Sequence, residues 1–406
     1  MQTDTPETAE EDLKPVWAIT AGHIAVDFYM TLFPPLLAVF KLHFGLSLVQ
    51  TSLLPAVVSV FGAVPQPFMG YLGDRGNRMA LAAGGLLVCG IFISLIGLAP
   101  TAWILALLLF ISALGSSVFH PTAGGLVTAF APKRPNMALS IFLTGGTLGM
   151  AISPITSTQI VERVGLPSLW LLAFPCVLIS AALYWTSRLA RSRPVVEPGV
   201  KLSFAFLRTA EMRPLWTLYA ISVLRSLIHA GYVGFTALLG AERGWTTGRI
   251  GWVLSGFLVC STLGRLLGGY VADRASPRKL LALSSILSMP FFVAFAAGEG
   301  SAVVGLYFVA GFIFETGLST NIVLAQQILP RNTSMATGLM MGFAWAVAGC
   351  LLPLVGLVSE TYSVSFAMTC VSLLLIPAAA LVALLPSGRN TRQTQSGADA
   401  STAESG

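Results

Sequence analysis

Twelve long apolar runs divide this chain, and they constrain its fold more than any other feature. A helix needs about 20 consecutive apolar residues to cross the hydrocarbon core of a bilayer. Of the 406 residues, 55% are hydrophobic and only 10% are charged, whereas soluble domains average about 25% charged residues. The sequence therefore predicts an all-α polytopic membrane protein with twelve transmembrane helices. The runs lie near residues 17–39, 50–72, 79–98, 102–129, 136–161, 167–187, 214–239, 249–271, 279–298, 302–328, 334–358 and 363–385.

The net charge of +6 reflects how lysine and arginine are placed around these runs. If the N-terminus is cytoplasmic and the spans alternate, 17 of the 23 Lys and Arg residues fall in cytoplasmic segments and only 4 on the opposite side. This asymmetry is the positive-inside bias of membrane proteins. We therefore expect a multi-pass protein of the cell (inner) membrane with both termini cytoplasmic. Contact with membrane lipid is expected, and binding to nucleic acid is not.

Two pairs of similar segments indicate an internal repeat. GYLGDRGNR (70–78) matches GYVADRASPR (269–278) at an offset of 199, and APKRPNMALSI (131–141) matches LPRNTSMATGL (329–339) at 198. Such repeats are typical of secondary transporters, which bind substrate near the bilayer midplane between the repeats. The expected organisation is a disordered cytoplasmic N-terminus (1–15), a six-helix half (16–187), a cytoplasmic linker (188–213), a second six-helix half (214–387) and a disordered cytoplasmic tail (388–406).

The paired G-x-x-x-D-R loops after the second and eighth runs resemble the signature loop of the major facilitator superfamily. Four further segments are similar, in order, to its fosmidomycin-resistance branch: GHIAVDFY, GSSVFHP, SIFLTGGTLG and LPRNTSMATGLMMGFAWAVAG. The resemblance implies two pseudo-symmetric halves with alternating access, and a proton-coupled transporter that exports a small anionic or amphipathic drug-like compound by proton antiport. The alternatives are a proton symporter or exchanger of a small organic anion, and a membrane sensor that moves no solute.

In that superfamily the signature loops hold the cytoplasmic side closed and release it when the transporter turns inward. A carboxylate followed by arginines at a helix end can join two helices and cap a neighbouring helix, which supports this gating role. The alternative is that the loops only anchor the helices at the membrane interface. Asn77 and Pro277 depart from the family's pattern and are expected to alter the turns. The matching positions are Gly70, Asp74, Arg75, Arg78, Gly269, Asp273, Arg274 and Arg278.

Few ionisable residues lie inside the apolar runs, and each is a functional candidate because charge is costly in a bilayer. His23 and Asp27 are four residues apart, so they share a helix face, and an imidazole beside a carboxylate can hold and pass a proton. We predict that His23, Asp27 and Glu315 couple transport to protons. The alternative for the first two is a structural pair that fixes the first span. Pro34 and Pro35 should break or kink that helix towards its outer end.

Four other residues are assigned to the substrate: His120, Arg225, His229 and Asn321. Arg225 and His229 also share a helix face, and a guanidinium group can hold a phosphonate or a carboxylate. The alternative for Arg225 is a permanent bridge to Asp27 or to Glu315. Asn321 could instead hydrogen-bond one helix to another.

Two residues of this kind have competing structural interpretations. His120 precedes Pro121, whose missing N–H frees a backbone carbonyl, and a hydrogen bond to that carbonyl is the alternative to a cavity role. Arg265 lies eight residues before Asp273, about 12 Å along a helix, so we expect it near the cytoplasmic gate.

The sequence contains none of the catalytic signatures that would indicate an enzyme. It has no P-loop, GxSxG or HExxH motif, and its five cysteines lie within apolar runs without a CxxC pair. We expect no catalytic residue, cofactor or metal site. The expected partners are a small-molecule substrate, protons and membrane lipid, for a chain that works as a monomer. GGTLGMAISP (145–154) partly resembles the antiporter motif of drug exporters, although Ile155 and Thr156 stand where that motif has glycine.

Overall fold

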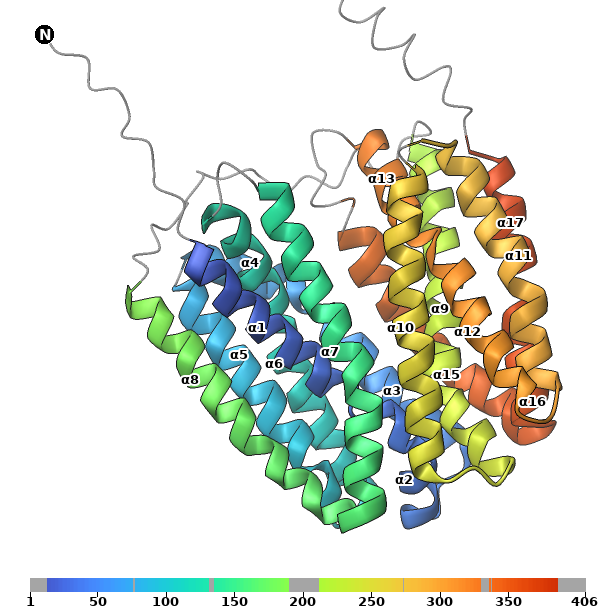
Figure 1. The fold of residues 1–406 in the computed structure, drawn as a ribbon, viewed down its shortest axis with the longest axis horizontal. Coiled ribbons are helices and arrows are strands. Elements are labelled where there is room, and N and C mark those ends of the chain that lie inside the picture. Colours follow the sequence, from blue (N-terminus) through green and yellow to red (C-terminus); the bar gives the residue numbers. More distant parts are fainter. Residues whose placement is uncertain are drawn as a thin grey trace, which may run out of the picture.

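The computed structural model describes residues 13–75, 77–130, 135–189, 212–272, 274–329, 336 and 338–385. These residues are almost entirely helical and include no β-strand. Their helices form two bundles that lie side by side (Figure 1); we call α1 to α8 the first half and α9 to α17 the second half. The predicted tail and most of the predicted linker lie outside the described residues. Residues 13–15, expected in a disordered N-terminus, are instead the first turn of α1.

The helices of the first half follow the first six predicted spans. Short 3-10 turns interrupt several of them. In chain order they are α1 (Leu13–Met30), η1 (Pro34–Leu36), α2 (Leu37–Phe44), α3 (Leu48–Ala63), α4 (Gln66–Arg75), α5 (Arg78–Ser94), η2 (Leu95–Leu98), α6 (Ala102–Phe130), α7 (Pro135–Val164), η3 (Leu166–Leu172) and α8 (Ala173–Leu189).

The second half repeats this arrangement over the last six predicted spans. The tenth predicted span is divided between two helices, and the eleventh contains a π-helical turn before α15. The elements are α9 (Arg213–Glu242), α10 (Thr247–Ala272), α11 (Pro277–Ala297), α12 (Ala302–Glu315), α13 (Leu318–Ile328), η6 (Leu339–Phe343), α15 (Ala344–Thr361), α16 (Val364–Leu373) and α17 (Leu375–Ala383).

Within the described ranges, eleven helical segments are long and apolar enough to cross a bilayer. The segment that completes the twelve predicted spans is α7, a helix of 30 residues that lies between α1 and α10 in Figure 1. It is rich in serine, threonine and glycine, which lowers its mean hydropathy. These residues suit a helix that is covered by other helices rather than by lipid.

The prolines of the first span interrupt it as predicted. Helix α1 ends at Met30, and Pro34 and Pro35 begin the 3-10 turn that leads into α2. A proline has no N–H to continue the helical ladder, so the α-helix is interrupted there. The break leaves His23 and Asp27 on a straight helix, two turns or less from its end.

Small residues let α1 and α7 approach closely within the first half. The Ser153 hydroxyl donates to the carbonyl oxygen of Phe28 at 2.5 Å. A Cβ atom at Gly149 would lie only 2.0 Å from the carbonyl oxygen of Ile24, so only glycine fits at this crossing. The motif that partly resembles the antiporter motif therefore packs α7 onto α1.

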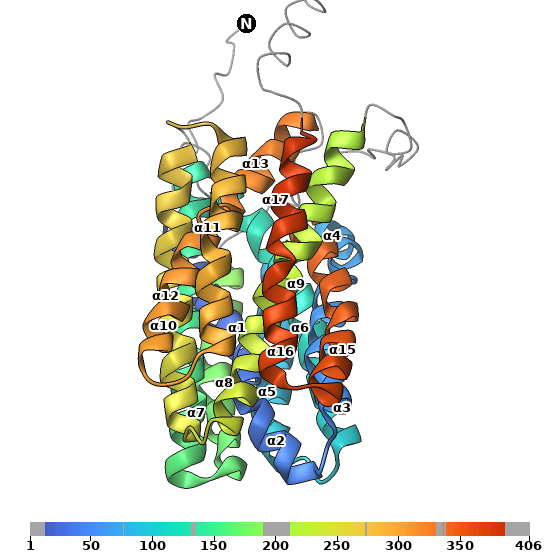
Figure 2. The ribbon, with the colours of Figure 1, turned by 90° about the vertical axis from the view of Figure 1, so that its right-hand side faces the viewer.

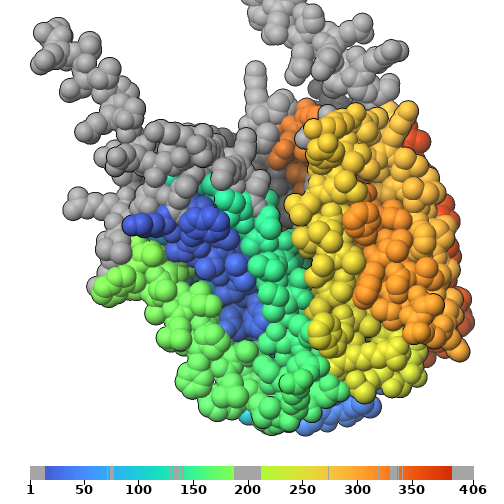
Figure 3. Space-filling view, in the orientation of Figure 1, coloured from blue at the N-terminus to red at the C-terminus, as the bar shows by residue number. Residues whose placement is uncertain are grey.

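The two halves touch mainly through α7 with α10 and through α3 with α15. In the first seam the Ile155 N–H donates to the Ser255 hydroxyl at 3.1 Å. A Cβ atom at Gly251 would lie 1.8 Å from Thr158 Oγ1 and 2.7 Å from the Pro154 carbonyl oxygen, so the two helices approach closely here. Figure 3 shows α7 and α10 in contact along the lower part of this face.

The second seam, between α3 and α15, is also built from small and polar residues and a backbone hydrogen bond. The Val49 N–H donates to Glu360 Oε2 at 3.1 Å, and a Cβ atom at Gly356 would lie 2.2 Å from Ser52 Oγ. Both seams lie near the end of the molecule opposite the start of α1 and the end of α17 (Figures 1 and 2). The two halves are therefore closed against each other at the end of the molecule opposite the start of α1 and the end of α17.

Candidate functional site

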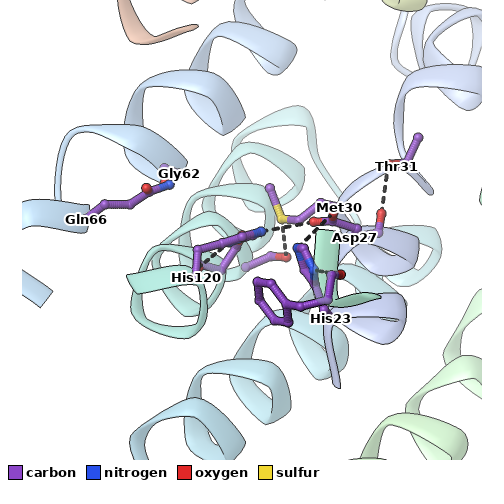
Figure 4. Close-up of polar contacts among 10 residues, drawn as sticks. His23, Asp27, Met30, Thr31, Gly62, Gln66 and His120 are labelled. Carbon is purple, nitrogen blue, oxygen red and sulfur yellow. Dashed lines mark hydrogen bonds and ion pairs between the residues drawn. The ribbon is translucent and has the colours of Figure 1, made fainter. Parts of the chain in front are cut away.

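A carboxylate lies between two imidazoles in the first half. Asp27 and His23 come from α1 and His120 comes from α6 (Figure 4). His120 Nε2 is 3.0 Å from Asp27 Oδ1, and His23 Nε2 is 3.3 Å from Asp27 Oδ2. The predicted contact between His23 and Asp27 on one helix face is therefore present, and the structure adds His120 to it. We call these three residues the His–Asp–His cluster.

Helix α7 fixes the first histidine of this cluster. His23 Nδ1 lies 2.7 Å from the Phe142 carbonyl oxygen, and the two rings stack with centroids 3.9 Å apart. Gly146, one turn further along α7, faces the same group. A Cβ atom there would lie 2.4 Å from Asp27 Oδ2 and 2.5 Å from His23 Cε1. The cluster therefore requires a glycine at this position.

The second histidine makes a different backbone contact from the one expected. His120 Nδ1 lies 3.0 Å from the Ser116 carbonyl oxygen and 3.2 Å from the Ser116 hydroxyl. Pro121 frees the carbonyl of Ser117, four residues earlier, so the structural alternative, a bond from His120 to the freed carbonyl, is wrong. Helix α6 continues through Pro121 to Phe130.

The His–Asp–His cluster also brings three ligand-type atoms within 4.8 Å of one another, a spacing at which these residues could hold a metal ion with small shifts. Metal–nitrogen and metal–oxygen bonds of about 2.0–2.2 Å would be needed. Each imidazole Nε2, however, already faces its own carboxylate oxygen at a hydrogen-bond distance. The contacts present are those of shared protons.

A second carboxylate lies between two bases in the second half. Glu315, at the end of α12, accepts from His229 Nδ1 at 3.0 Å through Oε1. Its Oε2 accepts from Arg265 Nη2 at 2.8 Å and from Arg265 Nε at 3.2 Å. The Glu315 side chain is 3% exposed and that of Arg265 is 30% exposed. Arg265, expected near the gate, lies seven residues before Ala272, the last residue of α10, and neutralises the buried carboxylate of Glu315 on α12.

Arg225 has partners that the sequence did not suggest. It donates to the Ser285 hydroxyl at 2.9 Å and to the Phe314 carbonyl oxygen, and its guanidinium lies 4.1 Å from the centre of the Phe314 ring. The permanent bridge from Arg225 to Asp27 or Glu315 is wrong, because neither carboxylate is within ion-pair distance of it. Arg225 is 3% exposed and joins α9 to α11 and α12.

Asn321 also lies inside the second half. Its side-chain amide donates to the Ser222 hydroxyl and lies 3.9 Å from Met340 Sδ. Because Asn321 is 1% exposed, these contacts favour the helix-to-helix alternative stated for this residue. They connect α13 to α9.

A small cavity lies where α7 meets the second half. Its volume is about 10 Å³, room for about one water molecule. Thr147 of α7 lines it next to Gly146, which contacts the His–Asp–His cluster. The two carboxylate clusters are thus separated by one helix. The other lining residues are Met150, His229, Leu258, Ser261, Thr262 and Arg265.

The predicted gating loops are described in part. Asp273 lies outside the described residues, as do the side chains of Asp74 and Arg75. Asn77 caps α5 by accepting from the Ala80 N–H at 3.1 Å, and Pro277 is the first residue of α11. Both departures from the family's pattern therefore occupy positions that favour helix initiation.

Two arginines of the second loop, Arg274 and Arg278, contact their own half. Arg278 donates to the carbonyl oxygens of Val382 and Ala383 at the end of α17, at 3.2 Å each. Arg274 donates to the Tyr270 carbonyl oxygen at 3.1 Å. The remaining described positions, Gly70, Arg78 and Gly269, lie on α4, at the start of α5 and on α10.

Comparison with known proteins identifies the family. The sequence model of the Major Facilitator Superfamily matches residues 19–353 and 218–404. The chain belongs to this superfamily. It is a membrane transporter by family and not an enzyme, as predicted, and the predicted all-α twelve-helix fold agrees with the fold of this family.

Two relatives and one solved structure illustrate the likeness. The fosmidomycin resistance protein of Escherichia coli (strain K12) is 25% identical over 86% of each chain. The multidrug resistance protein MdtG of Yersinia enterocolitica is 26% identical over 48% of this chain and 54% of its own. A bacterial homologue of the lysosomal transporter Spinster, solved in an inward-facing and unoccupied conformation, aligns with a TM-score of 0.79 at 15% identity, over 93% of this chain and 98% of that one.

Proposed function

We propose that this transporter is a proton-coupled exporter of a small anionic or amphipathic compound. It works as a monomer in the inner membrane, with both termini cytoplasmic. The observation that carries the proposal is the His–Asp–His cluster, which places a carboxylate and two imidazoles at hydrogen-bond distance inside the first half. Such a group can take up and release protons within a membrane, where isolated charges are costly.

The second cluster supports an anionic substrate. The Arg265 side chain is 30% exposed and lines the cavity against α7, whereas Arg225 is buried among its own partners. A guanidinium group recognises phosphonates and carboxylates through paired hydrogen bonds. We therefore assign anion binding to Arg265 with His229. Glu315 already receives three hydrogen bonds, so its proposed role becomes that of counter-ion to Arg265.

The closed seams fit one state of an alternating-access cycle. The halves are closed at the end opposite the start of α1 and the end of α17. If both termini are cytoplasmic, the closed end faces away from the cytoplasm, and this state is open towards the cytoplasm. An exporter in this state receives its substrate from the cytoplasm and must then open the seams on the other side. The organisation into two six-helix halves joined by the linker 188–213, and gating by the loops after α4 and α10, remain part of the proposal.

The fosmidomycin-resistance relative suggests fosmidomycin, a small phosphonate, as the first probe. Everted membrane vesicles containing the transporter are given an acidic lumen and radiolabelled fosmidomycin outside. An exporter driven by proton antiport accumulates the compound in the lumen and releases lumenal protons as it does so. Vesicles carrying the Asp27→Asn variant are the control for coupling.

The direction in which the compound moves relative to the protons distinguishes the main alternative, proton symport, from the proposed antiport. A proton symporter would move the compound and protons the same way, so an acidic lumen would drive the compound out of everted vesicles. A membrane sensor would show binding without any flux. Either result, obtained with fosmidomycin and then with a panel of small carboxylates and phosphonates, would overturn the export assignment.

A further inference from the structure

The hydrogen atoms of the His–Asp–His cluster can be assigned from its heavy-atom contacts. His23 Nδ1 faces the Phe142 carbonyl oxygen at 2.7 Å, and His120 Nδ1 faces the Ser116 carbonyl oxygen at 3.0 Å. A carbonyl oxygen can only accept a hydrogen bond, so each Nδ1 carries a hydrogen. The Ser116 hydroxyl is also near His120 Nδ1, but its carbonyl oxygen is closer.

This assignment leaves the other ring nitrogen of each histidine facing Asp27. In a neutral imidazole with hydrogen on Nδ1, the Nε2 atom has only a lone pair. An ionised carboxylate also has only lone pairs to offer. Both Nε2 contacts with Asp27, at 3.0 Å and 3.3 Å, therefore need a proton between their atoms. The observed geometry accounts for two such protons.

The two protons differ in their access to water. The His23 side chain is 5% exposed and its ring stacks on Phe142, whereas the His120 side chain is 28% exposed and that of Asp27 is 16% exposed. His23 and Asp27 also belong to the same helix, so their contact persists when α1 moves as a unit. The contact between His120 and Asp27 joins α6 to α1 and can open.

We propose that His120 carries the exchangeable proton of this transporter, one per cycle, and that the proton between His23 and Asp27 is retained. The inference rests on the proposed proton coupling and names the atom that performs it. When the proton leaves His120 Nε2 for water, the imidazole is neutral with its hydrogen on Nδ1. Two lone pairs then face each other across the His120–Asp27 contact, and this hydrogen bond between α6 and α1 is lost.

The surroundings of His120 leave few other groups to supply this proton. On α1 the titratable groups facing it are Asp27 and His23, whose ring centroid is 5.3 Å away. The α7 residues at the cluster, Phe142 and Gly146, are uncharged. On α5 the thiol of Cys89 is close enough to interact electrostatically with Asp27. Among the described residues, these are the titratable groups that the structure brings to the cluster.

Nitrogen-15 NMR of histidine-labelled protein in lipid nanodiscs tests the inference without any substrate. The chain has four histidines, and replacing each with glutamine in turn assigns their signals. As pH rises, His120 is expected to change from the doubly protonated form to the neutral form with hydrogen on Nδ1. His23 should keep its Nε2 proton while His120 loses its own, and His43, which lies on α2 outside the cluster, serves as a comparison signal.

Two results would overturn the inference. One is a neutral His120 with hydrogen on Nε2, and the other is a His23 that loses its proton before His120 does. The Asp27→Asn variant gives a second readout, because an amide can donate directly to His120 Nε2. In that variant the titration of His120 should move to lower pH by at least one unit; an unchanged titration would also contradict the assignment. Absence of proton-driven export of fosmidomycin and of every compound in the panel would refute the proposed function but leave this titration intact as a test.

Discussion

Glu360, near the end of α15 in the second half, accepts a hydrogen bond from the backbone N–H of Val49 in the first turn of α3 in the first half, at 3.1 Å. In the other seam a glutamate also lies close to the first turn of a helix of the opposite half. Glu162 of α7 lies against Gly248 in the first turn of α10, where a Cβ atom would be 1.9 Å from Glu162 Oε2. Glu162 and Glu360 are 198 residues apart, and Val49 and Gly248 are 199 apart, which are the offsets of the internal repeat. Each half therefore places a carboxylate at a helix N-terminus of the other half.

Removing either carboxylate charge should loosen the closed end. A negative charge at a helix N-terminus stabilises by about 0.3–1 kcal/mol, so Glu360→Gln or Glu162→Gln should shift the equilibrium towards opening by about two- to fivefold. This opening can be measured with a Ser255→Cys variant in a cysteine-free background. A membrane-impermeant maleimide is added on the side of the closed seams, and its rate of labelling is recorded. Ser255 is 7% exposed in the closed seam. Glu299→Gln, an exposed carboxylate in the turn between α11 and α12, is the control, and equal labelling rates in all variants would rule out the contacts as latches.

Asp27→Asn should uncouple transport from the proton gradient. An asparagine cannot hold the protons that both histidines share with the carboxylate. Proton coupling should therefore be lost, not merely moved to a different pH range. In proteoliposomes loaded with a pH indicator, fosmidomycin-driven proton movement should fall at least about tenfold, consistent with a lost charged hydrogen bond of more than 1.4 kcal/mol. Retention of full proton movement would show that the coupling site lies elsewhere, and Glu315 would then be tested first.

The sequence was sufficient to predict the fold because the constraints on a membrane helix are local. A run of apolar residues has one stable backbone conformation in a bilayer, and the repeat offset showed that the spans come in two related sets. The break at Pro34 and Pro35 follows from the missing N–H of proline in the same way. Even α7, the least apolar span, was recognisable by its length.

The partners of the buried charges could not be predicted, because they depend on which helices cross. His120 and Asp27 are 93 residues apart, and no pattern in the sequence indicates that α6 meets α1 at this level. Counting residues along its own helix predicts that Arg265 lies near the gate, but it gives no information about its partner. Its partner is on α12, which comes close because a Cβ atom at Gly264 would lie 2.0 Å from the Phe312 carbonyl oxygen.

Arg225 shows a second limit of sequence reasoning. A buried arginine suggests an acidic partner, but a guanidinium group can also be satisfied by hydroxyl groups, a carbonyl oxygen and an aromatic face. Ser284, Ser285 and Phe314 provide these. Serines in an apolar span carry no distinctive sequence signal, so their role emerges only from the packing of α9 against α11 and α12.

The Arg265–Glu315 pair should matter more for stability when one partner is removed than when both are. Breaking a buried pair costs about 3–5 kcal/mol, and the 30% exposure of the Arg265 side chain should reduce this because solvent screens its charge. Arg265→Met should therefore lower the melting temperature in detergent, and adding Glu315→Gln should restore most of the loss. Arg249→Met, at an exposed position on the same helix, is the control. Additive effects of the two substitutions would indicate that the pair is not coupled.

Gly146→Ala is the smallest change that should disturb the His–Asp–His cluster. The added methyl group would lie 2.4 Å from Asp27 Oδ2 and 2.5 Å from His23 Cε1, so the carboxylate or α7 itself must move. An alanine in place of a helical glycine otherwise favours the helix by about 1 kcal/mol, as Gly124→Ala should show, because nothing lies within 4 Å of a Cβ atom there. We expect Gly146→Ala to reduce proton-coupled transport several-fold and to change its pH dependence, while Gly124→Ala leaves both unchanged. Because α7 carries Thr147 to the cavity beside Arg265, unchanged coupling in Gly146→Ala would also argue against α7 as the connection between the two clusters.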